Sequence, residues 1–169
     1  MTHTNFARAG LLALCLAGLG GAAATGQIVR TPAPSPSAPL ATAVSVPAGS
    51  ELIFLSGVLP PADPHAPPGT TQAFGGDTRA QTIAALDRLK QTLTGLGLTP
   101  GDVVQAHAFL AGDPARNGDI DFAGFNAGWN QFFGTPDQPN KPARSTVKVA
   151  ALVAPGALVE IEVVAAKAR

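Results

Sequence analysis

The spacing of apolar residues predicts one long amphipathic helix near the middle of the chain. From residue 83 to residue 96, leucine and isoleucine recur at three- and four-residue steps, which places them on one face of a helix. Thr78 followed three residues later by Gln81 matches a capping box at its start. Gly95 and Gly97 supply its end. The stripe consists of Ile83, Leu86, Leu89, Leu93 and Leu96.

The pattern also predicts a second, shorter helix after it and several strands before and after it in the sequence. Residues 121–133 place four phenylalanines and Trp129 on one side of a helix, and Gly134 follows. Turn-forming residues at 47–50 and at 154–156 each separate two apolar segments, so we expect two hairpins. The predicted strands cover residues 27–30, 41–46, 51–58, 102–111, 145–153 and 158–165.

This β-β-β-α-β-α-β-β order predicts an α+β domain, in which one mixed β-sheet is covered by two helices on one face. Residues 31–39 are rich in proline, serine and alanine and are predicted to be an extended linker. Residues 60–78 are rich in proline, glycine and threonine and form a long loop for so small a domain.

The N-terminus has the pattern of a secretory signal peptide. Arg8 precedes an unbroken small and apolar stretch, residues 9–24, that is shorter than the ~20 residues a membrane-spanning helix needs. It ends in alanines at 22–24, so we expect cleavage near Ala24, export across the inner membrane to the periplasm, no membrane anchor afterwards, and a domain over residues 25–169. An uncleaved anchor is the alternative. A lipoprotein signal at Cys15 is disfavoured, because Leu14 stands where a small residue should precede the cysteine.

Composition excludes several classes of chemistry. The chain has 11 basic and 11 acidic residues and only 13% charged residues, which argues against nucleic-acid binding. A hydrophobic fraction of 46% argues against disorder. Cleavage near Ala24 would remove Met1 and Cys15, the single methionine and the single cysteine. Thiol catalysis, thiolate metal ligation and disulfides are therefore not expected in the exported form.

The last two predicted strands carry the most informative polar residues. Arg144, Thr146 and Lys148 alternate with valines and so share one strand face. Glu160 and Glu162 alternate with apolar residues in the same way. If these strands pair as a hairpin, the arginine and both carboxylates share one face of the sheet. One interpretation is a half-solvated hairpin whose charge pairs contribute a few tenths of a kcal/mol each. The other is an anion site, where arginine grips a carboxylate through two hydrogen bonds and a glutamate moves a proton.

Other candidate residues are weaker. His65 lies in the proline-rich loop and is expected to be solvated, whereas His107 is expected in the core or an interface. These two histidines have no spacing typical of a metal site. Asp113 is expected to cap a turn, and Ser56 follows an apolar strand, where its hydroxyl could be exposed. Trp129 is expected in the core or an interface. No nucleophile elbow, P-loop or dinucleotide fingerprint is present in the sequence.

Six segments follow one another in a specific order from about Gln27 to the C-terminus. They are LIFLSGVLP at 52–60, RAQTIAALDRL at 79–89, GLTPGDVVQAHAFLAGD at 97–113, DFAGFNAGWNQFFG at 121–134, PARSTVKVAAL at 142–152 and VEIEVVA at 159–165. Together they resemble the RidA (YjgF) family. The combination of PARSTVKVA and a following EIE strand is the most specific part of the resemblance.

The resemblance implies a chorismate-mutase-like α+β fold and a homotrimer with three sites in the clefts between subunits. It also implies an enamine/imine deaminase, which hydrolyses 2-imino acids such as 2-iminobutanoate and 2-iminopropanoate to 2-keto acids and ammonia without a metal or organic cofactor. Arg144 matches the arginine that binds the substrate carboxylate, and Glu160 matches the glutamate that positions the attacking water. Asn126 and Ser56 match residues near the cleft, and Thr146 stands where many relatives have cysteine.

The sequence also departs from the family pattern. Leu40 replaces a tyrosine that contacts substrate, Trp129 stands where many relatives have tyrosine, and residues 60–78 and 112–121 are longer than in archetypal members. Glu162 is expected to be structural. Two functions remain open: an exported imine hydrolase, or a non-catalytic trimeric module that binds small carboxylates or interacts with other molecules.

Overall fold

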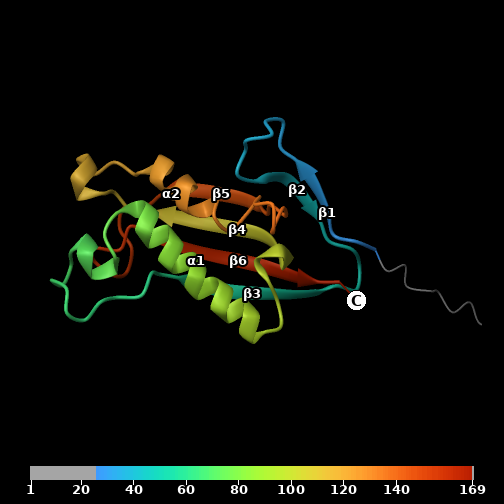
Figure 1. The fold of residues 1–169 in the computed structure, drawn as a ribbon, viewed down its shortest axis with the longest axis horizontal. Helices are drawn as coiled ribbons and strands as arrows, with labels where there is room; N and C mark the ends of the chain where they lie inside the picture. The colour runs from blue at the N-terminus through green and yellow to red at the C-terminus, as the bar shows by residue number, and fades with distance from the viewer. Residues whose placement is uncertain (1–25, 169) are drawn as a thin grey trace, which may run out of the picture.

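A six-stranded mixed sheet carries two α-helices on one face in the computed structural model, which describes residues 26–168 (Figure 1). The strands are β1 (Val29–Pro32), β2 (Ala41–Ser45), β3 (Glu51–Val58), β4 (Val103–Leu110), β5 (Ala143–Lys148) and β6 (Val159–Lys167), and the helices are α1 (Thr78–Gly95) and α2 (Phe122–Trp129). The α+β class and the two helices on one face, as expected from the sequence, are confirmed. The predicted signal peptide lies outside the described residues.

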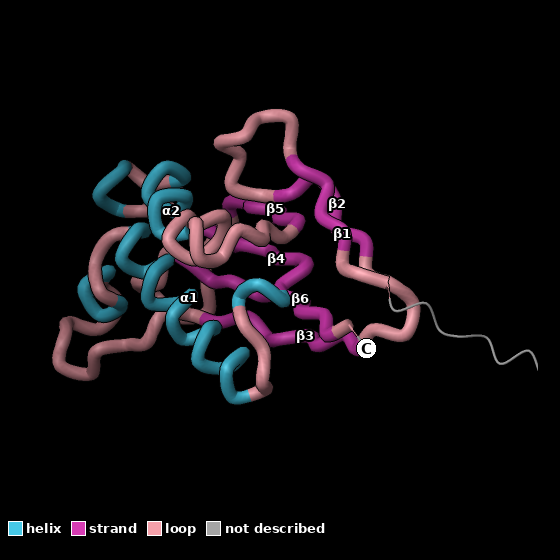
Figure 2. The backbone as a smooth tube through the Cα atoms, turned by 45° about the vertical axis from the view of Figure 1, so that its right-hand side comes forward, coloured by secondary structure: helices cyan, strands magenta, loops and turns pink. Residues whose placement is uncertain are grey.

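The strands follow the order β1-β2-β5-β4-β6-β3 across the sheet. β5 runs parallel to both β2 and β4, and the other neighbours are antiparallel. Both predicted hairpins are therefore wrong: β2 and β3 lie on opposite sides of the sheet, and β4 separates β5 from β6. The tube in Figure 2 shows the chain leaving β2 and returning along the far edge as β3. Residues 47–50 do form a turn. β3 nevertheless pairs with β6 and not with β2, because this pairing allows Ile53 and Leu55 to pack against the core.

The start of α1 differs from the predicted capping box. Asp77 is the N-cap, and its side chain accepts a hydrogen bond from the backbone N–H of Ala80 at 2.8 Å. Thr78 and Gln81 lie inside the helix and are buried, so the capping box is wrong. The Asp77 carboxylate, one residue earlier, satisfies one of the free N–H groups of the first turn, which leaves Gln81 available for contacts with loops. The helix ends at Gly95, as expected.

α2 is shorter than predicted, because it ends at Trp129 and residues 130–133 form turns. Asp121 caps its start by accepting from the Gly124 N–H at 3.0 Å. β5 also ends early, at Lys148 instead of residue 153, and residues 149–158 form a loop that leads to β6. β1 begins at Val29 and takes in the first two residues of the predicted linker.

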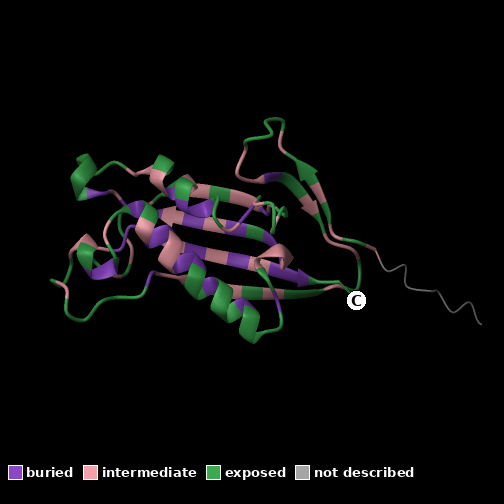
Figure 3. Ribbon diagram, in the orientation of Figure 1, coloured by how far each residue is buried: buried purple, intermediate pink, exposed green. Residues whose placement is uncertain are grey.

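The core lies between the two helices and the central strands. Figure 3 shows buried residues on both helices and on the central strands. Five of them, Leu89 and Leu93 of α1, Phe125 and Trp129 of α2, and Ile161 of β6, belong to one cluster. The Trp129 indole N–H donates to the Pro39 carbonyl at 2.8 Å, which satisfies its one polar group. The prediction that Trp129 lies in the core is confirmed. Within residues 26–168, no helix has the length and apolar character that a membrane crossing requires.

The opposite face of the sheet, which we call the open face, is not covered by either helix. Side chains of β4 and β6 that alternate with the core residues lie here, including His107, Phe109 and Glu160. Phe54 of β3 is 75% exposed on this face. Since a β-strand alternates its side chains between faces, each strand contributes one set to the core and one set to the open face.

Candidate functional site

Arg144 is held on the helix-covered face of the sheet. It pairs with the buried Ala106 of β4, so its side chain points toward α2. Its guanidinium carbon lies 4.9 Å from the ring centroid of Phe125 and 4.7 Å from that of Trp129. One guanidinium nitrogen, Nη2, donates to Oδ1 of Asn126 at 2.8 Å. Three residues of a single helix therefore fix the orientation of the guanidinium plane.

The remaining donors of Arg144 are unpaired. Its Nε and Nη1 atoms are buried without a hydrogen-bond partner among residues 26–168, and so is the hydroxyl of Thr146 two residues along β5. The guanidinium forms no ion pair with a carboxylate of the described chain. Burial lowers the pKa of Arg144 to about 10. A partly buried cation with free donors and no counter-ion favours the binding of an anion.

Glu160 lies on the open face, where it pairs with Phe109 of β4. Its carboxylate is placed over Gly57 of β3, and a Cβ atom at position 57 would overlap it. Arg144 and Glu160 therefore do not share a face within one chain, which corrects the expectation from the predicted hairpin. β4 lies between β5 and β6. The pairing register therefore places the side chains of Arg144, Thr146 and Lys148 on one face of the sheet and those of both glutamates on the other.

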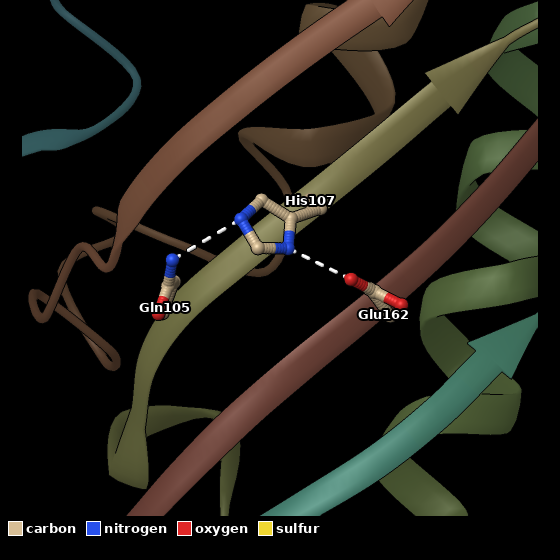
Figure 4. A network of polar contacts seen from close by, with 3 residues as sticks. All are labelled: Gln105, His107 and Glu162. Atoms are coloured by element: carbon tan, nitrogen blue, oxygen red, sulfur yellow. Dashed lines mark hydrogen bonds and ion pairs between the residues drawn. The ribbon is translucent and has the colours of Figure 1, made fainter.

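Glu162 contacts a histidine on the same open face. The Nδ1 atom of His107 lies 2.8 Å from Glu162 Oε1, and the side-chain amide nitrogen of Gln105 lies 3.1 Å from His107 Nε2 (Figure 4). His107 is 37% exposed through its side chain, so it does not lie in the core of the chain, and the alternative of an interface position stays a prediction. The amide of Gln105 donates to Nε2, which assigns the ring proton to Nδ1 and makes Nδ1 the donor to Glu162.

The other predicted site residues are spread over the molecule. Asn126 contacts Arg144, as described above, while Ser56 is exposed where β3 changes register. Leu40 lines a separate cavity of about 240 Å³. Asp113 caps a turn by accepting from the Ala115 N–H at 2.9 Å, as predicted. His65 is exposed in its loop, also as predicted.

Lys148 shares the strand face of Arg144 at the far end of β5. Its ammonium donates to the Gly118 carbonyl at 2.8 Å and lies 3.5 Å from an Asp119 carboxylate oxygen. Lys148 is therefore not part of the Arg144 site. Within residues 26–168, three or more histidine, cysteine or acidic side chains do not gather at any point where they could hold a metal ion.

Comparison with known proteins identifies the family. The family model described as endoribonuclease L-PSP matches residues 30–167. A RutC family protein of Haemophilus influenzae is 34% identical over 145 residues, covering 83% of this chain and 97% of the relative. The chain belongs to the RidA (YjgF) family.

Solved structures of RidA-family proteins have the same fold. A Rid family protein, YyfB from Yersinia pestis, superposes with a TM-score of 0.61 at 24% identity, covering 83% of this chain and 98% of its own. The E. coli protein TdcF, solved with bound serine, superposes with a TM-score of 0.55 at 28% identity, covering 73% and 85% of the two chains. These likenesses agree with the mixed sheet and the chorismate-mutase-like arrangement expected from the RidA resemblance.

Sequence reasoning missed two features of the surroundings of Arg144 and Glu160. The first is the contact of Arg144 with Phe125 and Trp129, because their four-residue spacing on one helix face predicts only a core or interface position. The second is Gly57, which leaves room for the carboxylate of Glu160. A glycine inside a predicted strand signals such a close approach, so the second feature could have been found.

Proposed function

We propose that this RidA-family protein is an exported homotrimeric enzyme that hydrolyses small 2-imino or enamino acids to 2-keto acids and ammonia. One observation carries the proposal: the Arg144 guanidinium is partly buried, keeps two unpaired donors and has no carboxylate partner among the described residues. A planar, oriented guanidinium in this state is suited to a carboxylate.

The chemistry needs a fixed carboxylate and an activated water. Arg144 holds the substrate carboxylate, and the hydroxyl of Thr146 on the same face supplies a further hydrogen bond. Water adds to the C=N carbon while the Glu160 carboxylate accepts a water proton and passes it to the nitrogen. The resulting carbinolamine transfers its hydroxyl proton to the amine, the C–N bond breaks, and ammonia leaves the keto acid. No step requires a metal or an organic cofactor.

Assembly from several copies brings the two residues together in this proposal. Within one chain Arg144 and Glu160 lie on opposite faces of the sheet, so a site containing both requires a second subunit. The open face supports such an interface, because Leu52, Phe54 and Val147 expose apolar surface there. The serine bound in the TdcF crystal structure supports a ligand of the size of a small amino acid.

The test generates 2-iminobutanoate in solution with a threonine-consuming pyridoxal-phosphate enzyme and follows its loss. We expect the parent protein to accelerate hydrolysis and the variants Arg144→Ala and Glu160→Gln to abolish the acceleration. Arg116→Ala, which removes an exposed arginine from a surface contact with Asp121, is the matched control and should keep full activity. Light scattering should give the mass of a trimer. An Arg144→Ala variant as fast as the parent refutes the proposal.

A second candidate is a non-catalytic module that binds small carboxylates. Leu40 favours it, because it stands at the position of the family tyrosine and the chain contains no tyrosine at all. In this case 2-keto acids should raise the melting temperature of the parent and not of Arg144→Ala, while hydrolysis stays at the uncatalysed rate.

Export to the periplasm is a separate part of the proposal and rests on residues 1–24. Mass spectrometry of the protein recovered from the periplasm should show an N-terminus near Thr25. An intact Met1 on the recovered protein would contradict cleavage.

A further inference from the structure

One cavity of the described chain lies away from Arg144 and Glu160, neither of which lines it. It has a volume of about 700 Å³ and is formed by residues 69–72, 111–115, 118, 148–152 and 154–158. Arg144 pairs with Ala106, whereas Lys148 at the edge of the cavity pairs with Leu110. Four residues of strand, roughly 13 Å, therefore separate the guanidinium from this cavity.

The cavity lies where strands end and loops gather. The parallel strands β4 and β5 both finish here, and β6 begins beside them at Val159. Two of its walls come from residues of the segments 60–78 and 112–121. Ligands commonly bind beyond the carboxyl ends of parallel strands, where loops of variable length meet.

Buried contacts hold the walls in place. The fully buried side chain of Gln81 donates to the carbonyls of Gly76 and Gly156 at 3.0 and 3.1 Å and accepts from the Leu158 N–H at 2.7 Å. The backbone of Gly156 lies against that of Thr70 so closely that a side chain at Gly156 would not fit. The cavity is therefore pre-formed, which reduces the entropy that a ligand must overcome to bind.

The lining is mostly apolar, with Thr70, Thr71 and Gln72 as its neutral polar residues and one charge of each sign. Alanine, valine, leucine, proline and glycine form most of the wall, and Asp113 and Lys148 are its charged residues. The Lys148 ammonium has three N–H donors, of which Gly118 and the largely exposed Asp119 use at most two. One oxygen of Asp113 accepts from the Ala115 N–H, which leaves acceptor capacity on its carboxylate.

We propose that this cavity is a second binding site, for a free α-amino acid with a large apolar side chain. Lys148 contacts the carboxylate of the ligand, Asp113 accepts from its ammonium, and the alanine-rich wall takes the side chain. The lining offers one cation and one anion, so a zwitterion can place its carboxylate and its ammonium each against an opposite charge. The site is independent of the proposed hydrolysis, since it shares no residue with Arg144 or Glu160.

Calorimetric titration of the purified protein with L-leucine and L-phenylalanine tests the site. We expect binding that weakens about tenfold or more in Lys148→Met, because a charge-assisted hydrogen bond is lost. Lys167→Met, which removes an exposed lysine at the far end of β6, is the matched control. Ala150→Phe should block binding by filling the cavity, and its wild-type alanine is exposed enough for the fold to tolerate the change. Ala151→Leu serves the same purpose if Ala150→Phe fails to fold.

The same titrations separate this site from the proposed active site. Arg144→Ala should leave the affinity for leucine unchanged. Binding that is lost in Arg144→Ala and kept in Ala150→Phe places the ligand at Arg144 and overturns the second site. Two analogues of leucine test whether the site requires a zwitterion: 4-methylpentanoate lacks the ammonium, and 3-methylbutylamine lacks the carboxylate. If either one binds with the same affinity as leucine, the proposal that the ligand is a zwitterion is overturned. If neither leucine nor phenylalanine binds at millimolar concentration, the proposal of a second site is overturned. Imine hydrolysis is measured independently, so the two proposals can fail separately.

Discussion

Arg144 on β5 and Glu160 on β6 point to opposite faces of one sheet, with β4 between their strands. A site that contains both must therefore combine two subunits. This requirement can be tested with oligomers that contain two different variants. Arg144→Ala and Glu160→Gln should each be inactive alone. After co-refolding in equal amounts, about a quarter of the sites should contain an intact arginine and an intact glutamate, and about a quarter of the parent activity should return.

Mixing either variant with itself, or mixing folded proteins without exchange of subunits, should restore nothing. If the co-refolded mixture stays inactive although mass spectrometry shows mixed oligomers, the two residues do not act across an interface.

Replacing Arg144 should abolish ligand binding without lowering the stability of the protein. Arg144→Met keeps the apolar packing against Phe125 and Trp129 and removes a cation without a counter-ion. We expect the free energy of unfolding at pH 7 to be unchanged or higher by up to ~2 kcal/mol, since lost cation–π contacts offset part of the gain. Binding of 2-oxobutanoate should disappear. Urea denaturation and calorimetry measure the two effects, and Arg116→Met on the surface should change neither.

The pKa of Arg144 predicts how ligand binding depends on pH. Burial lowers this pKa to about 10, and an anionic ligand needs the protonated guanidinium. Affinity for 2-oxobutanoate should therefore be constant between pH 7 and pH 9 and should fall above pH 10.

In the unliganded protein, the lowered pKa means that the charged form of Arg144 reduces stability below pH 10. This penalty is relieved as the pH rises through the folded-state pKa. The unfolding free energies of the parent and Arg144→Met should converge there.

Gly57 should matter for turnover more than for binding. A methyl group at position 57 would displace the Glu160 carboxylate, so Gly57→Ala should lower kcat by tenfold or more, while KM, which depends on Arg144, changes little. Gly95→Ala is the control, because no atom lies within 4 Å of a Cβ placed at this helix position. It should leave kcat unchanged and raise stability by up to ~1 kcal/mol. Equal effects of both substitutions on kcat would show that Gly57 has no role in positioning Glu160.

The buried amide of Gln81 should be important for stability. Gln81→Leu leaves the carbonyls of Gly76 and Gly156 and the Leu158 N–H without their partner, at ~1–3 kcal/mol for each unsatisfied group that stays buried. We expect a loss of at least 2 kcal/mol in denaturant unfolding and faster proteolysis of residues 149–158. Gln131→Leu, in the exposed turn that follows α2, should change stability by less than about 0.5 kcal/mol.

Local patterns predicted the elements well and their partners poorly. The apolar stripe of α1 was correct because the period of a helix depends on residues that are neighbours in sequence. The capping box failed because two candidate caps, Asp77 and Thr78, stand side by side and only the folded geometry selects one. Both hairpins failed because a turn signal states where the chain bends and not which strand it meets next.

The sequence by itself determined that Arg144, Thr146 and Lys148 occupy one face of a strand and that Glu160 and Glu162 occupy one face of another, since alternation is fixed by backbone geometry. It also determined the RidA family. Only the tertiary structure decided that β4 lies between those strands, that the arginine and the glutamates face opposite sides, and that three long loops enclose a second cavity. The physical reason is that strand order follows the burial of apolar faces from distant parts of the chain, which no local pattern encodes.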